Sequence, residues 1–183
     1  MRSTFFGLVA FALAATLGSV PSNAQGQMPA QGGARNAPQQ GSVQFLDLAA
    51  AKKMVAAAEA AATAANQHVA ICVMDANGDV VLEERMDTTP HIPIVTAQGK
   101  ARAVLLFGMP TGQIADAIQQ KKPVDASVTA PPVGVGGGEI TVMRGGLPVI
   151  KDGKIIGAIG VGGSASEQDE KFSQAGIDAL GLK

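Results

Sequence analysis

The sequence has very few aromatic residues. The 183 residues include no Trp, no Tyr and six Phe, so that aromatic residues make up only 3% of the chain. Proteins that bind single strands or RNA usually stack the bases on aromatic side chains and present a basic surface. A basic surface is not expected here, because 14 Lys and Arg are balanced by 15 Asp and Glu. The composition therefore argues against nucleic acid, or an anionic membrane surface, as a partner.

Cysteine and histidine are also scarce, with one Cys (Cys72) and two His (His68 and His91). One thiol cannot form an internal disulfide, and its apolar neighbours predict that Cys72 is buried and unreactive. The sequence has no CxxC, HExxH or histidine cluster for zinc, no GxSxG elbow, and no GxxxxGK[ST] or proper GxGxxG loop. The usual zinc, serine-hydrolase and nucleotide sites are therefore not predicted.

The first 24 residues have the pattern of a signal peptide. Arg2 is followed by an uncharged apolar run at 5–20, and residues 21–24 end in a small-x-small cleavage pattern. The alternative is an uncleaved anchor, but the run is short for a membrane span of ~20 residues. We expect cleavage after Ala24, export to the periplasm or the medium, and no membrane insertion after cleavage.

The rest of the chain is predicted to be a linker and one domain. Residues 25–42 consist mainly of Gln, Gly, Pro and Ala, a composition typical of a disordered tether. Residues 43–183 have the length of a single domain with its own core.

Apolar periodicity and turn residues predict the element order α-β-β-α-α-β-β-β-α. We expect helices at 48–65, 94–107, 111–121 and 166–180, and strands at 68–74, 80–85, 139–143, 147–150 and 155–161. The Asn77-Gly78 and Asp152-Gly153 pairs are typical of tight hairpins. Tight hairpins favour a single α/β (α+β) domain with an antiparallel sheet flanked by helices over a parallel doubly wound sheet.

His91 is the most prominent candidate for a ligand-binding residue. It lies between Pro90 and Pro93, whose fixed φ angles stiffen the loop, so that its imidazole could be held out as a ligand or an acid/base. The alternative is a solvated loop histidine. His68 lies at a strand edge and is expected to be structural. The acidic residues at 83–87 could bind a hard cation, or could simply close the end of a strand with Arg85.

Several short motifs, taken together and in order, resemble the GlcG/HbpS-type heme-binding protein family. They are VMDANGD at 73–79, RMD at 85–87, GKARA at 99–103, GGLPV at 145–149 and GKIIGAIGV at 153–161. The resemblance covers essentially residues 45–182. It implies a profilin- or PAS-like domain with an antiparallel sheet between helices, assembled into homo-oligomers from dimers to octamers.

The resemblance also implies a set of site residues. Arg85 and Asp87 match the Arg-x-Asp that ends the family's second strand, and Lys100 matches its Lys-Ala on the following helix. These groups are expected to face a shared pocket, where Arg and Lys suit the propionates of heme or the carboxylate of a small acid. His91 lies in the loop between them and is the candidate axial ligand, and thus the candidate metal ligand.

Three functions follow as hypotheses. The first is an exported, non-enzymatic oligomer that binds heme or a related tetrapyrrole, since secreted members of the family are associated with heme binding and redox sensing beside a sensor kinase. The second is a small-molecule enzyme or accessory factor that acts on hydroxy or keto acids, as in glycolate-type metabolism, through Lys100, Arg85 and Asp87. The third is a structural assembly module without a ligand.

Overall fold

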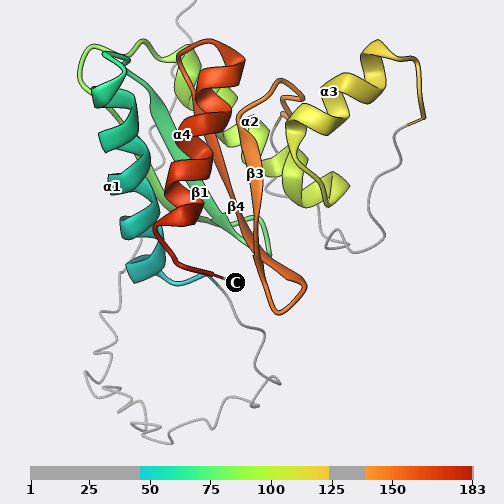
Figure 1. Ribbon diagram of the computed structural model, residues 1–183, viewed down its shortest axis with the longest axis horizontal. Coiled ribbons are helices and arrows are strands. Elements are labelled where there is room, and N and C mark those ends of the chain that lie inside the picture. The colour runs from blue at the N-terminus through green and yellow to red at the C-terminus, as the bar shows by residue number, and fades with distance from the viewer. Residues whose placement is uncertain (1–45, 124–138, 183) are drawn as a thin grey trace, which may run out of the picture. The chain divides into compact units, whose positions relative to one another are not determined.

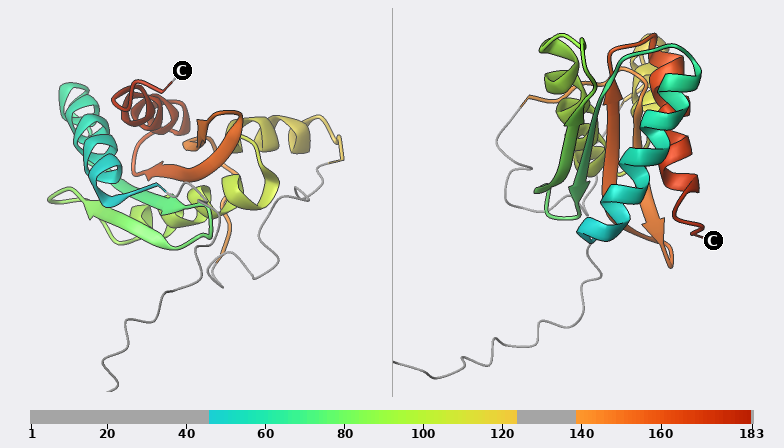
Figure 2. Two further views of the ribbon diagram at one scale, coloured as in Figure 1. Left: turned by 90° about the horizontal axis from the view of Figure 1, so that it is seen from below. Right: turned by 90° about the vertical axis from the view of Figure 1, so that its left-hand side faces the viewer.

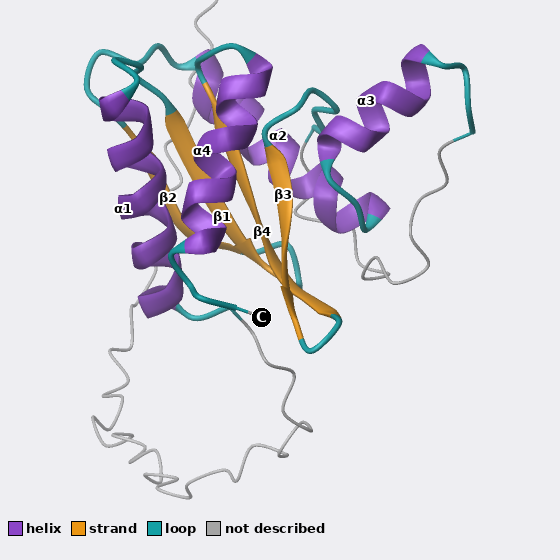
Figure 3. Ribbon diagram, viewed as in Figure 1, coloured by secondary structure: helices purple, strands orange, loops and turns teal. Residues whose placement is uncertain are grey.

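A computed structural model describes residues 46–123 and 139–182. The predicted signal peptide (1–24) and linker (25–42) lie outside the described residues. The elements, in chain order, are α1 (Leu48–Ala64), β1 (Ala70–Asp75), β2 (Val80–Arg85), α2 (Ile92–Phe107), α3 (Thr111–Gln119), β3 (Gly146–Lys151), β4 (Lys154–Gly162) and α4 (Ser166–Asp178) (Figures 1 and 3). No helix among the described residues is long and apolar enough to cross a membrane.

The four strands form one antiparallel sheet in the order β2-β1-β4-β3. Helices α1 and α4 cover one face, and α2 covers the other (Figure 2). Side chains alternate between the faces along β1: Ile71 and Val73 pack with α1 and α4, whereas Cys72 and Met74 pack against α2. The predicted antiparallel sheet flanked by helices is therefore confirmed.

The predicted strand at 139–143 is wrong, so that the observed order is α-β-β-α-α-β-β-α. This segment crosses α2 instead, where the Thr141 N–H donates to the Gly99 carbonyl at 3.0 Å. The approach is close because Gly99 has no side chain; a Cβ there would lie 2.5 Å from Thr141 Oγ1. The segment therefore has a partner on the helix rather than on the edge of the sheet.

A buried ion pair joins the helices on the two faces of the sheet. Lys100 Nζ on α2 donates to Asp169 Oδ2 on α4 and to the Val161 carbonyl, both at 2.7 Å. The two side chains are only 3% and 2% exposed. Asp169 Oδ1 also accepts the Ser164 N–H at 3.0 Å. Burial raises the pKa of the Asp169 carboxyl, and the Lys100 ammonium and the Ser164 N–H oppose that shift.

Glycine at position 145 leaves room for this pair. A Cβ at Gly145 would lie 2.7 Å from Asp169 Cβ and 2.8 Å from Lys100 Nζ. Ser173 Oγ donates to the Gly145 carbonyl at 2.8 Å, which fixes the backbone at the same point. The ion pair, the start of β3 and α4 are therefore packed as one unit.

We predict that Asp169→Ala lowers the free energy of unfolding by roughly 3–5 kcal/mol, because it leaves the Lys100 ammonium buried without its partner. Lys100→Met combined with Asp169→Leu should cost less than the sum of the two single changes, because neither charge then remains buried. Denaturant unfolding of the wild type, Lys100→Met, Asp169→Leu and the double variant measures the coupling. Asp116→Ala is the control, since the Asp116–Arg144 pair has the same 2.7 Å separation but is 47% and 31% exposed. A loss for Asp169→Ala no larger than for this control would contradict the prediction.

Candidate functional site

The end of the sheet where β2 leads into α2 brings together three of the predicted site residues, Arg85, Asp87 and His91. Arg85 Nη1 donates to the Thr89 carbonyl at 2.9 Å, while Thr89 Oγ1 donates to the Val69 carbonyl at 3.4 Å. Thr89 is 3% exposed, whereas the three site residues are exposed. Residues 86–91, named here the β2–α2 loop, are thus anchored at Thr89 with polar side chains facing solvent.

The second histidine of the chain lies at the same end of the sheet. His68 Nδ1 is 3.0 Å from the Asp87 carbonyl, so that its ring supports the β2–α2 loop. The neighbouring Thr88 has φ 65°. A β-branched residue in this left-handed region costs of order 1–3 kcal/mol, and such strain is often found at functional sites. The expected structural role of His68 agrees with this contact.

His91 occupies the position directly before the first turn of α2. Its side chain makes no cap hydrogen bond to the helix, and it is exposed. Two aliphatic side chains on the following turns are exposed as well, Ile92 at 66% and Val95 at 37%. The imidazole therefore lies next to an apolar helix surface in contact with solvent.

The structure does not bring Lys100 to this loop. Its ammonium is buried in the pair with Asp169, on the part of α2 that faces Val161 and α4. The spacing from Arg85 to Lys100 could not show this, because Asp169 is 69 residues further along the chain. Of the residues expected to share a pocket, Arg85, Asp87 and His91 are therefore exposed at one end of the sheet, whereas Lys100 is buried away from them.

The acidic residues at the end of β2 have partners of their own. Glu83 Oε1 accepts from Gln98 Nε2 at 2.7 Å. Burial, followed by the nearby Glu59, raises the pKa of Glu84. Among the residues that the structure describes, no group of three or more His, Cys, Asp or Glu is placed to hold a metal ion.

Cys72 has the buried environment that its neighbours predict. It is fully buried beneath α2. Burial, followed by the charge of Glu83, raises the pKa of its thiol to about 12. A thiol with this pKa is protonated at neutral pH, which makes it a poor nucleophile and metal ligand.

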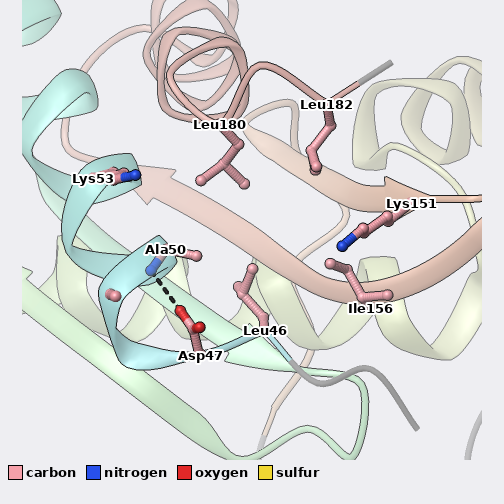
Figure 4. A pocket seen from close by; sticks show the side chains of 9 residues that line it. Leu46, Asp47, Ala50, Lys53, Lys151, Ile156, Leu180 and Leu182 are labelled. Atoms are coloured by element: carbon pink, nitrogen blue, oxygen red, sulfur yellow. Dashed lines mark hydrogen bonds between the residues drawn. The ribbon is translucent and has the colours of Figure 1, made fainter. Parts of the chain in front are cut away.

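A pocket of about 280 Å³ lies at the opposite end of the sheet (Figure 4). It is formed by the start of α1, the β3–β4 hairpin and residues after α4. The sequence analysis missed it because its walls come from segments far apart in the chain, and no local pattern marks them.

Comparisons with curated proteins find relatives that this chain matches over most of their length. An uncharacterised 15.0 kDa protein of Citrobacter freundii is 36% identical over 135 residues, which is 74% of this chain and 92% of the relative. Protein GlcG of Escherichia coli strain K12 is 34% identical over 111 residues, which is 61% of this chain and 76% of GlcG.

Solved structures give the same fold. A double mutant of HbpS from Streptomyces reticuli superposes with a TM-score of 0.64 at 26% identity, covering 89% of this chain and 98% of HbpS. A complex of PduOC with heme has a TM-score of 0.65, covering 76% of this chain and 97% of PduOC. At 22% identity, the PduOC complex supports the fold alone.

The family model described as "Haem degrading protein HbpS-like" matches residues 46–178. This range takes in all four helices and all four strands of the described structure. The resemblance seen in the motifs is thereby confirmed. The chain belongs to the HbpS-like family.

Proposed function

We propose that the protein binds heme or a related tetrapyrrole at the β2–α2 loop. The observation that carries this proposal is the position of His91, an exposed imidazole with no cap hydrogen bond beside the exposed aliphatic side chains of Ile92 and Val95. An imidazole nitrogen is a common axial ligand of heme iron, and the macrocycle needs an apolar surface on which to lie.

The charged residues at this end of the sheet fit the rest of the ligand. The guanidinium of Arg85 is held near the loop by its bond to the Thr89 carbonyl, and it is exposed. A guanidinium binds carboxylates in a bidentate manner, which suits a heme propionate. Asp87 has a positioning role, because its backbone carbonyl contacts the His68 ring. This contact fixes the loop between Arg85 and His91.

Similarity to known proteins supports the same proposal. The matching family is described as haem degrading, and PduOC, which shares the fold, forms a complex with heme. In this chain the proposed site consists of one histidine as a candidate iron ligand, one arginine for a propionate, and aliphatic side chains for the macrocycle. It fits an iron tetrapyrrole that is bound at the surface rather than enclosed by aromatic rings.

We further propose that the protein is exported and acts as a homo-oligomer. Export is supported by the apolar run at 5–20 and by the cleavage pattern that ends at Ala24. Self-association is supported by exposed apolar side chains on the segment that crosses α2, Ile140 and Met143. Exposed apolar surface of this kind commonly marks a protein interface.

Titration of hemin into the purified protein tests the heme site. We expect a red-shifted Soret band for the wild type and, for His91→Ala, an affinity weaker by about tenfold or more, since even the loss of residues behind a metal ligand costs 10–100-fold. His68→Gln is the matched control, because it removes the other exposed histidine of the same end while the glutamine amide can still donate to the Asp87 carbonyl and support the loop. An unchanged Soret band and affinity in His91→Ala would remove His91 from the site.

Native mass spectrometry of the protein purified from cells that export it tests both export and oligomerisation. We expect the subunit to have the mass of a chain that begins at Gln25. We also expect complexes whose masses are integral multiples of the subunit mass. A subunit that retains residues 1–24 would contradict cleavage, and a monomer at micromolar concentration would contradict oligomerisation. Bound tetrapyrrole would be seen in the same spectrum as added mass.

A further inference from the structure

The pocket at the far end of the sheet from the β2–α2 loop has an apolar floor. Leu46 and Ile156 are 4% and 8% exposed, and Leu180 and Leu182 pack against the same core cluster. Figure 4 shows these four aliphatic side chains directed toward one another from three segments of the chain. An aliphatic group placed here would be removed from water, which favours binding in proportion to the apolar area buried.

Two lysines flank this floor from different elements. Lys53 comes from α1 and Lys151 from the end of β3, and Figure 4 shows them on opposite sides of the aliphatic floor. The one acidic lining residue is Asp47, whose Oδ1 already accepts the Ala50 N–H at 2.7 Å as the N-cap of α1. The pocket thus has two cations, one engaged carboxylate and an aliphatic floor.

We propose that this pocket binds a small amphipathic carboxylate, a short-chain aliphatic acid, with its carboxylate at the rim, where Lys53 and Lys151 attract it, and its chain on the leucines. Both parts of the pocket are needed for this assignment. A simple inorganic anion would leave the apolar floor in contact with water, and a neutral hydrocarbon would leave the two ammonium groups without a partner.

The volume sets the size of the acid. About 280 Å³ is comparable with roughly nine water molecules at ~30 Å³ each. It is slightly below the ~300–1,000 Å³ that is usual for drug-sized ligands. An acid with about six carbons therefore fits, whereas a tetrapyrrole does not. This site is independent of the proposed heme site, which lies at the other end of β4.

Isothermal titration with sodium hexanoate tests the proposal, with sodium acetate and hexan-1-ol as comparators. Acetate has the charge without the chain, and hexan-1-ol has the chain without the charge. We expect hexanoate to bind more tightly than either one, because only hexanoate uses both parts of the pocket. Equal affinities for hexanoate and acetate, or for hexanoate and hexan-1-ol, would overturn the proposal.

Variants of the lining residues locate the binding. Lys53→Gln and Lys151→Gln should each weaken hexanoate about two- to fivefold, the range expected when one partly exposed ion pair is lost. Lys52→Gln is the matched control, since Lys52 neighbours Lys53 on α1 but does not line the pocket. Equal losses in Lys52→Gln and Lys53→Gln would overturn the proposal.

Asp47→Asn should act in the opposite direction. Asn caps a helix about as well as Asp, so that α1 should keep its N-terminus while the pocket loses its negative charge. Hexanoate should then bind more tightly, and weaker binding by a variant with unchanged thermal unfolding would count against the site. Hemin titration of Lys53→Gln separates the two proposals, because the Soret response should equal that of the wild type whether or not hexanoate binds.

Discussion

The Lys100–Asp169 pair is the constraint on which the rest of the structure depends. It holds α2 on one face of the sheet to α4 on the other, with both charges buried and hydrogen-bonded. Burying either charge alone would cost several kcal/mol, so that the two helices are required to stay in one relative position. His91 directly precedes α2, so that its place at the end of the sheet depends on where α2 packs. An interior interaction therefore positions a surface residue.

The two ends of the sheet have different chemistry. At one end, the β2–α2 loop and the two elements it joins present an imidazole, a guanidinium and exposed aliphatic side chains, an arrangement that suits a flat ligand lying on the surface. At the other end, Lys53 and Lys151 border a small apolar pocket that suits a short acid. The strands between them are packed on both faces, which keeps the two regions apart. The few aromatic residues of the sequence are consistent with both, because neither region relies on stacking.

Local patterns predicted much of the fold. The β-branched run at 68–74 and the Asn77-Gly78 turn were enough to place the first hairpin, since these signals depend on neighbouring residues. The segment at 139–143 has an equally good strand pattern, yet it pairs with Gly99 on a helix. A sequence pattern shows which residues can adopt an extended backbone. The segment with which those residues pair depends on where the folded chain leaves room for a close approach. Gly99 provides that room only once α2 is folded.

The candidate site divides in the same way. The sequence by itself determined the fold class, the family and the grouping of Arg85, Asp87 and His91, because these residues lie within a few positions of one another. Only the tertiary structure decided that Lys100 is buried against Asp169, and that Leu46, Lys53, Lys151 and Leu182 share one pocket. The physical reason is that burial and electrostatic pairing depend on distances in space. For residues tens of positions apart, those distances are set by the packing of helices on the sheet rather than by local sequence.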